Sequence, residues 1–131
     1  MNVLAKVGRV LFALPMLVFS FFHFTNAGAM AAFVPIPGGT FWVYLTGLAL
    51  LAAAIAILTG KQAVLATRLL GLMILIFALS IHLPGVLKAP DPAAMQLSMT
   101  NFLKDTALAG AAWVLSGVVQ QQEAEESAGE A

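Results

Sequence analysis

Apolar residues fill four long runs of the chain, and short polar or turn-forming segments separate them. The runs cover residues 7–27, 40–59, 64–82 and 98–119. A helix needs about 20 apolar residues to cross the roughly 30 Å hydrocarbon core of a bilayer, so each run can form one membrane span. The pattern predicts an all-α protein whose single domain, residues 1–119, is a four-helix transmembrane bundle.

The segments between the runs contain residues that end helices. The stretch "PIPGG" separates the first two runs, "GKQ" forms a tight polar turn before the third, and "LPGVLKAPDP" forms the longest loop. Proline interrupts a helix interior, and glycine adopts turn conformations easily. After the last run, residues 120–131 are polar and acidic, which predicts a disordered tail.

The composition fits lipid better than water. The chain has 131 residues, of which 61% are hydrophobic and 9% are charged, whereas soluble domains carry about 25% charged residues. There is no cysteine, which excludes disulfides and thiolate chemistry. The formal net charge is zero and no basic cluster occurs, so membrane lipid is an expected partner and nucleic acid is not.

The positions of lysine and arginine predict the orientation of the bundle. In short loops these residues gather on the cytoplasmic side of a membrane. We therefore place both termini, with the acidic tail, in the cytoplasm, and we take Arg9 and Arg68 as anchors at the inner interface. Four basic residues flank the side of the N-terminus and the second loop, and two lie on the other side: Lys6, Arg9, Lys61 and Arg68 against Lys88 and Lys104.

A cleaved signal peptide is the alternative interpretation of the first run. The start is basic, an apolar stretch follows, and "NAGAMAA" offers small residues of the kind found at cleavage sites. Signal peptides have an apolar core of about 7–15 residues. The first run is longer, with Pro15 inside it, which favours a retained span.

The first and third runs share an internal repeat. Arg9 and His23 are fourteen residues apart, and so are Arg68 and His82; the chain has no other arginine or histidine. These pairs coincide at an offset of 59, while the second and fourth runs align at an offset of 60. We interpret the bundle as two helix hairpins related by an axis along the membrane normal, a parallel repeat. Chance similarity among leucines and alanines is the alternative, and it does not explain the histidines.

The second and fourth runs each carry a stripe of small residues on one helical face. Small residues let helix backbones approach closely in lipid, so we expect both stripes to pack against a neighbouring helix. At the offset of 60, Ala49, Ala52 and Ala56 match Ala109, Ala112 and Ser116.

Polar residues are expected to meet near the outer end of the bundle. Fourteen residues span about 21 Å of helix, so arginines at the inner interface place both histidines toward the outer leaflet. Lys104 and Asp105 lie about two turns inside the outer end of the fourth run, at a similar depth. The predicted cluster consists of His23, Asn26, Tyr44, His82, Lys104 and Asp105.

Three interpretations of this cluster stay open. In the first, the histidines and Asp105 satisfy one another and hold the helices in register, while Lys104 reaches the lipid headgroups. In the second, the ionisable groups form a ligand or proton site, in which a histidine exchanges protons or donates a hydrogen bond to a quinone carbonyl. The third is a haem held by both histidines, which no CxxCH motif supports. A metal site has only Asp105 to join the histidines.

Four stretches of the chain resemble the DoxX-like family of small bacterial membrane proteins: "GRVLFALPMLVFSFFHF", "VPIPGGTFWVYLTGLALLAAA", "ATRLLGLMILIFALSIHLPG" and "NFLKDTALAGAAW". The resemblance covers residues 8–113, and "HLPG" and "NFLKD" are its most specific elements. It implies a four-helix bundle in the bacterial inner membrane. Some relatives act as the small membrane subunit of a thiosulfate:quinone oxidoreductase. Others resemble partners of redox-stress enzymes, and distant eukaryotic relatives behave as cargo receptors or assembly chaperones.

Two departures limit what the resemblance implies about chemistry. Related bundles that reduce disulfides and quinones use cysteine pairs, and this chain has no cysteine. A position after "YLTG" where relatives often hold glutamate is Leu50 or Leu51 here. We therefore expect a non-catalytic accessory of a respiratory or quinone-linked redox system, with a redox-enzyme or other membrane-protein partner. The alternatives are a scaffold or chaperone-like membrane protein without a small ligand and, third, a transporter, which would need to form a homo-oligomer.

Overall fold

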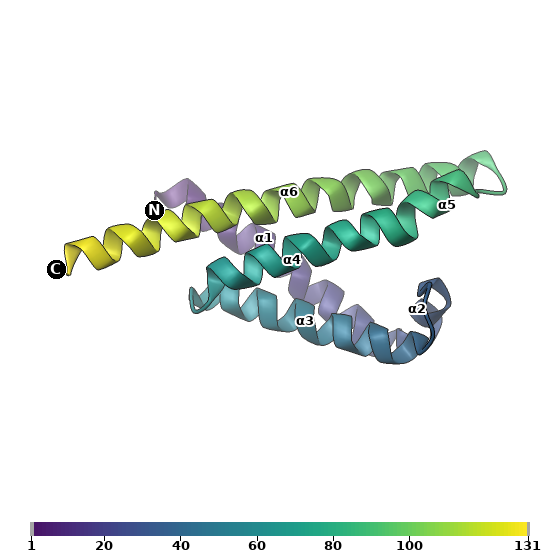
Figure 1. The fold of residues 1–131 in the computed structure, drawn as a ribbon, viewed down its shortest axis with the longest axis horizontal. Helices are drawn as coiled ribbons and strands as arrows, with labels where there is room; N and C mark the ends of the chain where they lie inside the picture. Colours follow the sequence, from purple (N-terminus) through teal and green to yellow (C-terminus); the bar gives the residue numbers. More distant parts are fainter. Residues whose placement is uncertain (1, 131) are drawn as a thin grey trace.

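The computed structural model describes residues 2–130, and no strand occurs among them. Figure 1 shows long helical segments joined by short helical turns and loops, and four of these segments are candidate membrane spans. Each of the four is long and apolar enough to cross a membrane, which confirms the prediction of an all-α chain with four candidate spans. In chain order the elements are α1 (Val3–Thr25), α2 (Ala27–Met30), η1 (Ala31–Phe33), α3 (Gly39–Thr59), α4 (Ala63–Phe77), the π-helical turn η2 (Ala78–His82), α5 (Leu83–Leu87) and α6 (Pro92–Gly129).

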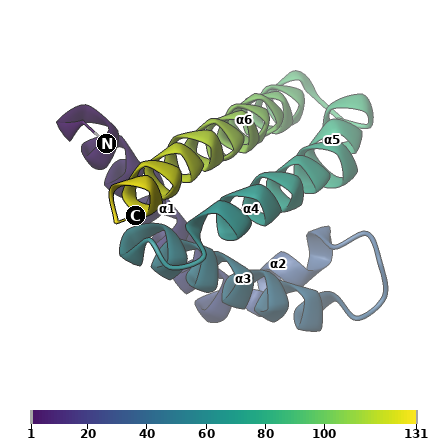
Figure 2. The same ribbon diagram turned by 60° about the vertical axis from the view of Figure 1, so that its left-hand side comes forward.

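The long helices form two antiparallel pairs. Helix α1 packs against α3, helix α4 packs against α6, and a smaller contact between α3 and α4 joins the pairs. Both chain ends lie at one end of the molecule, together with the turn between α3 and α4 (Figures 1 and 2). We call this the terminal end, and the opposite end, with α2 and α5, the distal end.

The third and fourth spans are longer than the sequence pattern predicted. The third was expected over residues 64–82 but runs without interruption from Ala63 to Leu87. The fourth was expected to begin at residue 98. It begins instead at Pro92, because Asp91 caps it: Asp91 Oδ1 accepts a hydrogen bond of 2.8 Å from the Ala94 N–H.

The acidic tail differs most from its prediction. Residues 120–129 were expected to be disordered, but they continue α6 to Gly129. Glutamine, glutamate and alanine all favour helices, and no proline or glycine interrupts them before Gly129. A hydrogen bond of 2.7 Å from Gln122 Nε2 to Glu126 Oε1 adds support at i, i+4 spacing.

Side chains from all four long helices form one apolar core. In lipid such a core is stabilised mainly by close packing rather than by exclusion of water. Its buried members are Ala13 and Met16 from α1, Leu50, Ala53, Ala54 and Ile57 from α3, Leu70 and Ile74 from α4, and Ala109 from α6.

The two small-residue stripes have different surroundings, contrary to the prediction that both pack closely. Ala109, Ala112 and Ser116 are buried on α6, but Ala49 and Ala52 are exposed on α3. The buried face of α3 differs from the predicted stripe by one residue, which is a rotation of about 100° around the helix. It presents Leu50, Ala53 and Ile57, which match Ala109, Ala112 and Ser116 at an offset of 59 instead of 60.

One glycine in each pair allows the close approach of its helices. A Cβ atom on Gly71 of α4 would lie 2.6 Å from Trp113 Nε1 and 3.1 Å from the Ala109 carbonyl oxygen of α6. A Cβ atom on Gly47 of α3 would lie 2.9 Å from His23 Cβ of α1. Both distances below 3 Å are shorter than a normal van der Waals contact, so neither position has room for a side chain.

We predict that Gly71→Ala lowers the free energy of unfolding by about 1–3 kcal/mol, because the new methyl group overpacks the contact between α4 and α6. Thermal or denaturant unfolding in detergent micelles measures the change. Gly110→Ala is the matched control, since a Cβ there meets nothing within 4 Å. It should be neutral or stabilise by about 0.5–1 kcal/mol, as alanine favours helices. Equal effects of the two substitutions would contradict the close contact at Gly71.

Candidate functional site

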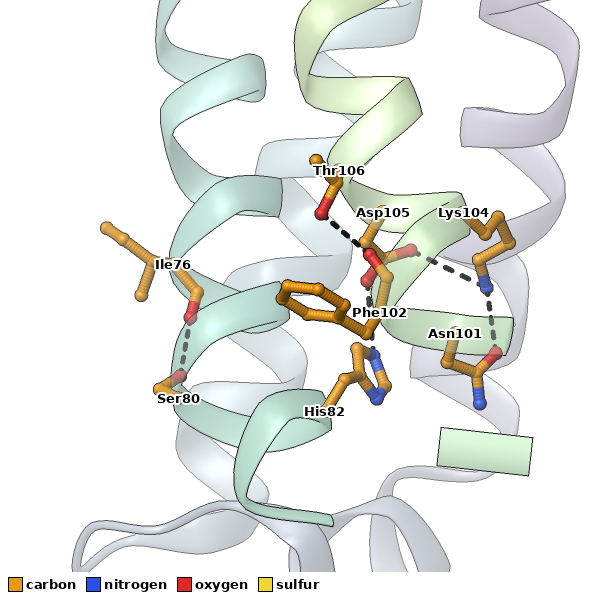
Figure 3. Close-up of polar contacts among 8 residues, drawn as sticks. All are labelled: Ile76, Ser80, His82, Asn101, Phe102, Lys104, Asp105 and Thr106. Carbon is orange, nitrogen blue, oxygen red and sulfur yellow. Dashed lines mark hydrogen bonds and ion pairs between the residues drawn. The ribbon is translucent and has the colours of Figure 1, made fainter. Parts of the chain in front are cut away.

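A π-helical turn places His82 at the distal end of the third span. The turn η2 covers Ala78–His82, and the Leu83 N–H bonds to the Ala78 carbonyl oxygen, five residues earlier. Such a turn adds one residue to an α-helix and rotates the residues that follow it, and π-turns occur often at functional sites. Ala78 is fully buried, which fixes the turn against its neighbours. His82 is the last residue of the turn and lies toward α6 (Figure 3).

His82 pairs with Asp105 of α6. Nε2 of His82 lies 3.1 Å from Oδ2 of Asp105, and the side chains are 24% and 13% exposed. The other carboxylate oxygen of Asp105 lies 3.6 Å from Lys104 Nζ. Asp105 is thus held between an imidazole and an ammonium group, as Figure 3 shows.

Lys104 connects this pair to a third helix. Its Nζ donates to Asn101 Oδ1 at 3.3 Å and lies 5.6 Å from the centre of the Phe19 ring of α1. A lysine ammonium over an aromatic face gains a cation–π attraction. We call His82, Asn101, Lys104 and Asp105 the distal polar site.

The distal polar site has the groups needed to bind or exchange a proton. A carboxylate only accepts hydrogen bonds, so the contact with Asp105 places a proton on Nε2 of His82. The other ring nitrogen, Nδ1, then accepts a bond when the ring is neutral and donates one when it is charged. Partial exposure of both side chains leaves room for a ligand to approach.

The other three residues of the predicted cluster make their contacts elsewhere. His23 Nδ1 bonds to the carbonyl oxygen of Phe19 on its own helix at 2.7 Å. Asn26 Nδ2 donates to the Phe22 carbonyl oxygen at 3.3 Å, and the Tyr44 ring stacks on Phe24 at 6.2 Å between ring centres. The predicted group of six therefore divides: His82, Lys104 and Asp105 come together, and His23, Asn26 and Tyr44 do not join them.

The reason for this division lies in helix pairing. Helical periodicity gives the face on which a residue lies, but it does not give the helix that this face meets. His23 packs against α3, where Gly47 offers no side chain. At an offset of 59, the α3 residue that corresponds to Asp105 is Thr46, so the first pair has no carboxylate at this position.

Arg9 and Arg68, which the sequence predicts as anchors at the inner interface, each make hydrogen bonds to a neighbouring helix. Arg9 Nε donates to the Ile57 carbonyl oxygen of α3, and Nη2 lies 3.5 Å from that of Leu58. Arg68 Nε donates to Ser116 Oγ of α6 at 3.2 Å, and its Nη2 donates to Gln120 Oε1 at 2.8 Å. Each arginine thus crosses to the opposite helix of its own pair, a role that counting charges in loops did not predict.

Within residues 2–130, no three or more His, Cys, Asp or Glu side chains are grouped so that they could hold a metal ion. Comparison of the chain with protein-family models, curated proteins and solved structures found no match. The geometry of the distal polar site is therefore the main guide to function.

We predict that His82 and Asp105 are energetically coupled. In a double-mutant cycle with His82→Ala, Asp105→Asn and the double variant, the coupling energy should be about 1–2 kcal/mol, as expected for a hydrogen bond to a charged group. Unfolding in detergent micelles measures each variant. His23→Ala combined with Asp105→Asn is the control cycle and should show additive effects. A coupling near zero for His82 would mean that the pair does not form.

Proposed function

We propose that this chain is a DoxX-like multi-pass protein of the bacterial inner membrane that acts as a non-catalytic accessory of a quinone-linked redox system. One observation supports this most directly: a partly exposed histidine–aspartate pair joins two helices that are long and apolar enough to span a membrane. Ionisable side chains are costly in a membrane, and those present often serve a ligand or proton pathway. The resemblance to relatives that work beside quinone-linked enzymes supports the same proposal.

The proposed ligand is the headgroup of a membrane quinone. A quinone carbonyl accepts a hydrogen bond from the ammonium group of Lys104 or, when the His82 ring is charged, from its Nδ1–H; these two groups lie on either side of Asp105. When the quinone is reduced, its hydroxyl groups donate instead, and Asp105 provides the acceptor. The electron transfer itself is assigned to a partner enzyme, and this chain positions the headgroup and exchanges protons with it.

We also propose that the two helix pairs are a parallel repeat. The two arginines support this: Arg9 bonds to a residue 48 positions later, Ile57, and Arg68 bonds to a residue 48 positions later, Ser116. The buried faces of α3 and α6 match at the same offset of 59 that relates the arginines. Duplication of a single helix hairpin explains both the equal spacing of the arginine contacts and the common offset of the buried faces.

A scaffold without a small ligand is the second candidate, and one surface favours it. Between α3 and α4 lies an apolar groove of about 520 Å³, lined by small and aliphatic side chains such as Ala49, Ala52 and Leu69. A membrane helix of a partner or of a second copy fits a groove with such small walls. This candidate predicts a protein that co-purifies with the chain whether or not His82 and Asp105 are intact.

We predict that the purified protein retains quinone and that His82→Ala or Asp105→Asn lowers the retained amount by about tenfold, because each removes a hydrogen bond made to a charged or polarised group. Solvent extraction followed by chromatography of the purified protein measures the bound quinone. His23→Ala is the matched control: it removes the other histidine, which bonds to its own helix. Equal quinone content in all variants, with normal respiration, would contradict the proposal.

A second prediction concerns orientation. The chain has no cysteine, so single cysteines can be introduced without background. Ala89→Cys, in the distal loop, should react with a membrane-impermeant maleimide in intact spheroplasts. Ser127→Cys, near the C-terminus, should react only after lysis, because the distribution of basic residues predicts that the termini lie in the cytoplasm. The reverse labelling pattern would mean that the bundle is inverted.

A further inference from the structure

A hollow of about 390 Å³ opens at the terminal end, between α1, the turn from α3 to α4, and the last part of α6. We call it the terminal hollow. It lies at the opposite end of the molecule from the distal polar site, and its walls are polar where the helices leave their apolar segments. In a membrane this level is occupied by lipid headgroups.

Charges of opposite sign line separate walls of the terminal hollow. Arg9 of α1 and Lys61 of the turn supply positive charge, and Glu123 and Glu126 of α6 supply negative charge. Over residues 2–130 the ion pairs are those that Asp105 makes at the distal end, so the two walls do not neutralise each other directly. A ligand that carries both charges, a short distance apart, would satisfy both walls.

The wall formed by α6 also has an unused hydrogen-bond acceptor. Gln122 Nε2 donates to Glu126, but Gln122 Oε1 has less than 1 Å² of exposed surface and no hydrogen-bond partner among the described residues. A shielded acceptor without a donor costs free energy, and native proteins leave few of them. Gln122 is one of the residues that line the terminal hollow, so a donor bound there lies close to this oxygen.

The second arginine provides an internal comparison. At the corresponding place in the other helix pair, Arg68 is engaged by the side chains of Ser116 and Gln120. Within residues 2–130, the hydrogen bonds of Arg9 go to the backbone carbonyl groups of Ile57 and Leu58 at the end of α3. Arg9 also lines the terminal hollow, and a guanidinium group has five N–H donors, enough to bind a phosphate group as well.

We propose that the terminal hollow binds the headgroup of phosphatidylethanolamine. Arg9 and Lys61 bind the phosphate, and Glu123, Glu126 and Gln122 accept hydrogen bonds from the primary ammonium group. Soluble glycerophosphoethanolamine has the same chemistry, but we assign the lipid because the acyl chains can follow the apolar side chains beside Arg9. Val10 and Leu11, the next residues of α1, are 44% and 63% exposed.

To test this, the full-length protein in mild detergent is mixed with equimolar phosphatidylethanolamine, phosphatidylcholine and phosphatidylglycerol that have identical acyl chains. Native mass spectrometry counts the bound lipids. We expect phosphatidylethanolamine to be retained roughly three- to tenfold over phosphatidylcholine, whose quaternary ammonium cannot donate hydrogen bonds. Equal retention of these two lipids, or a preference for anionic phosphatidylglycerol, would overturn the proposal.

Two pairs of variants distinguish an effect on lipid binding in the terminal hollow from a general effect on folding. Gln122→Leu and Glu123→Gln should each reduce the preference for phosphatidylethanolamine to near equality, while the exposed neighbours, Gln121→Leu and Glu125→Gln, should retain it. Gln122→Leu removes an unpartnered oxygen together with the hydrogen bond to Glu126, two effects of opposite sign, so the melting temperature without lipid should change little. Loss of the preference in both members of either pair would overturn the proposal.

A soluble competitor identifies the source of the headgroup. Glycerophosphoethanolamine at the concentration of the lipid should leave the melting temperature unchanged, whereas phosphatidylethanolamine should raise it. Equal stabilisation by both would mean that the hollow binds a soluble metabolite rather than a lipid. The readout needs no quinone, and His82→Ala should retain the lipid preference, so this inference and the proposed function can fail separately.

Discussion

The packing of this protein depends on two arginines that cross from one helix to the other within each antiparallel pair. A guanidinium group keeps its charge in proteins, so its N–H groups need hydrogen-bond acceptors wherever neighbouring helices shield them from solvent. Arg9 finds them on the backbone of Ile57 and Leu58, and Arg68 finds them on the side chains of Ser116 and Gln120. These contacts fix how far each pair of helices can slide, and the glycines at positions 47 and 71 then allow the backbones to approach.

The two pairs use the same plan but differ at each end of the bundle. At the distal end, the second pair carries Asp105 opposite His82, while the first pair has Thr46 at the corresponding position. At the terminal end, Arg68 is met by side chains, while Arg9 faces a hollow lined by charges. Each end of the bundle thus has a chemical feature that one helix pair carries and the other lacks.

The π-turn at Ala78–His82 links packing to chemistry. A regular helix would continue from Ile74 with the same faces, and His82 would be rotated away from its observed position. The extra residue in the turn directs the imidazole to Asp105, and Lys104 and Phe19 extend the contact to α1. Ala78, the first residue of the turn, is fully buried, and this packing stabilises the irregular backbone.

The sequence by itself determined the number of long helices, their apolar character and the residues that can carry charge within them. These properties depend on local hydrophobicity and on proline, glycine and capping residues, which act over a few positions. The tertiary structure decided which charged residues meet. His23 and His82 are indistinguishable in pattern, yet only His82 faces a carboxylate, because α4 packs against α6 and a π-turn rotates its end. The one-residue rotation of α3 that exposes Ala49 is also set by contact between helices, which no periodicity within one helix can specify.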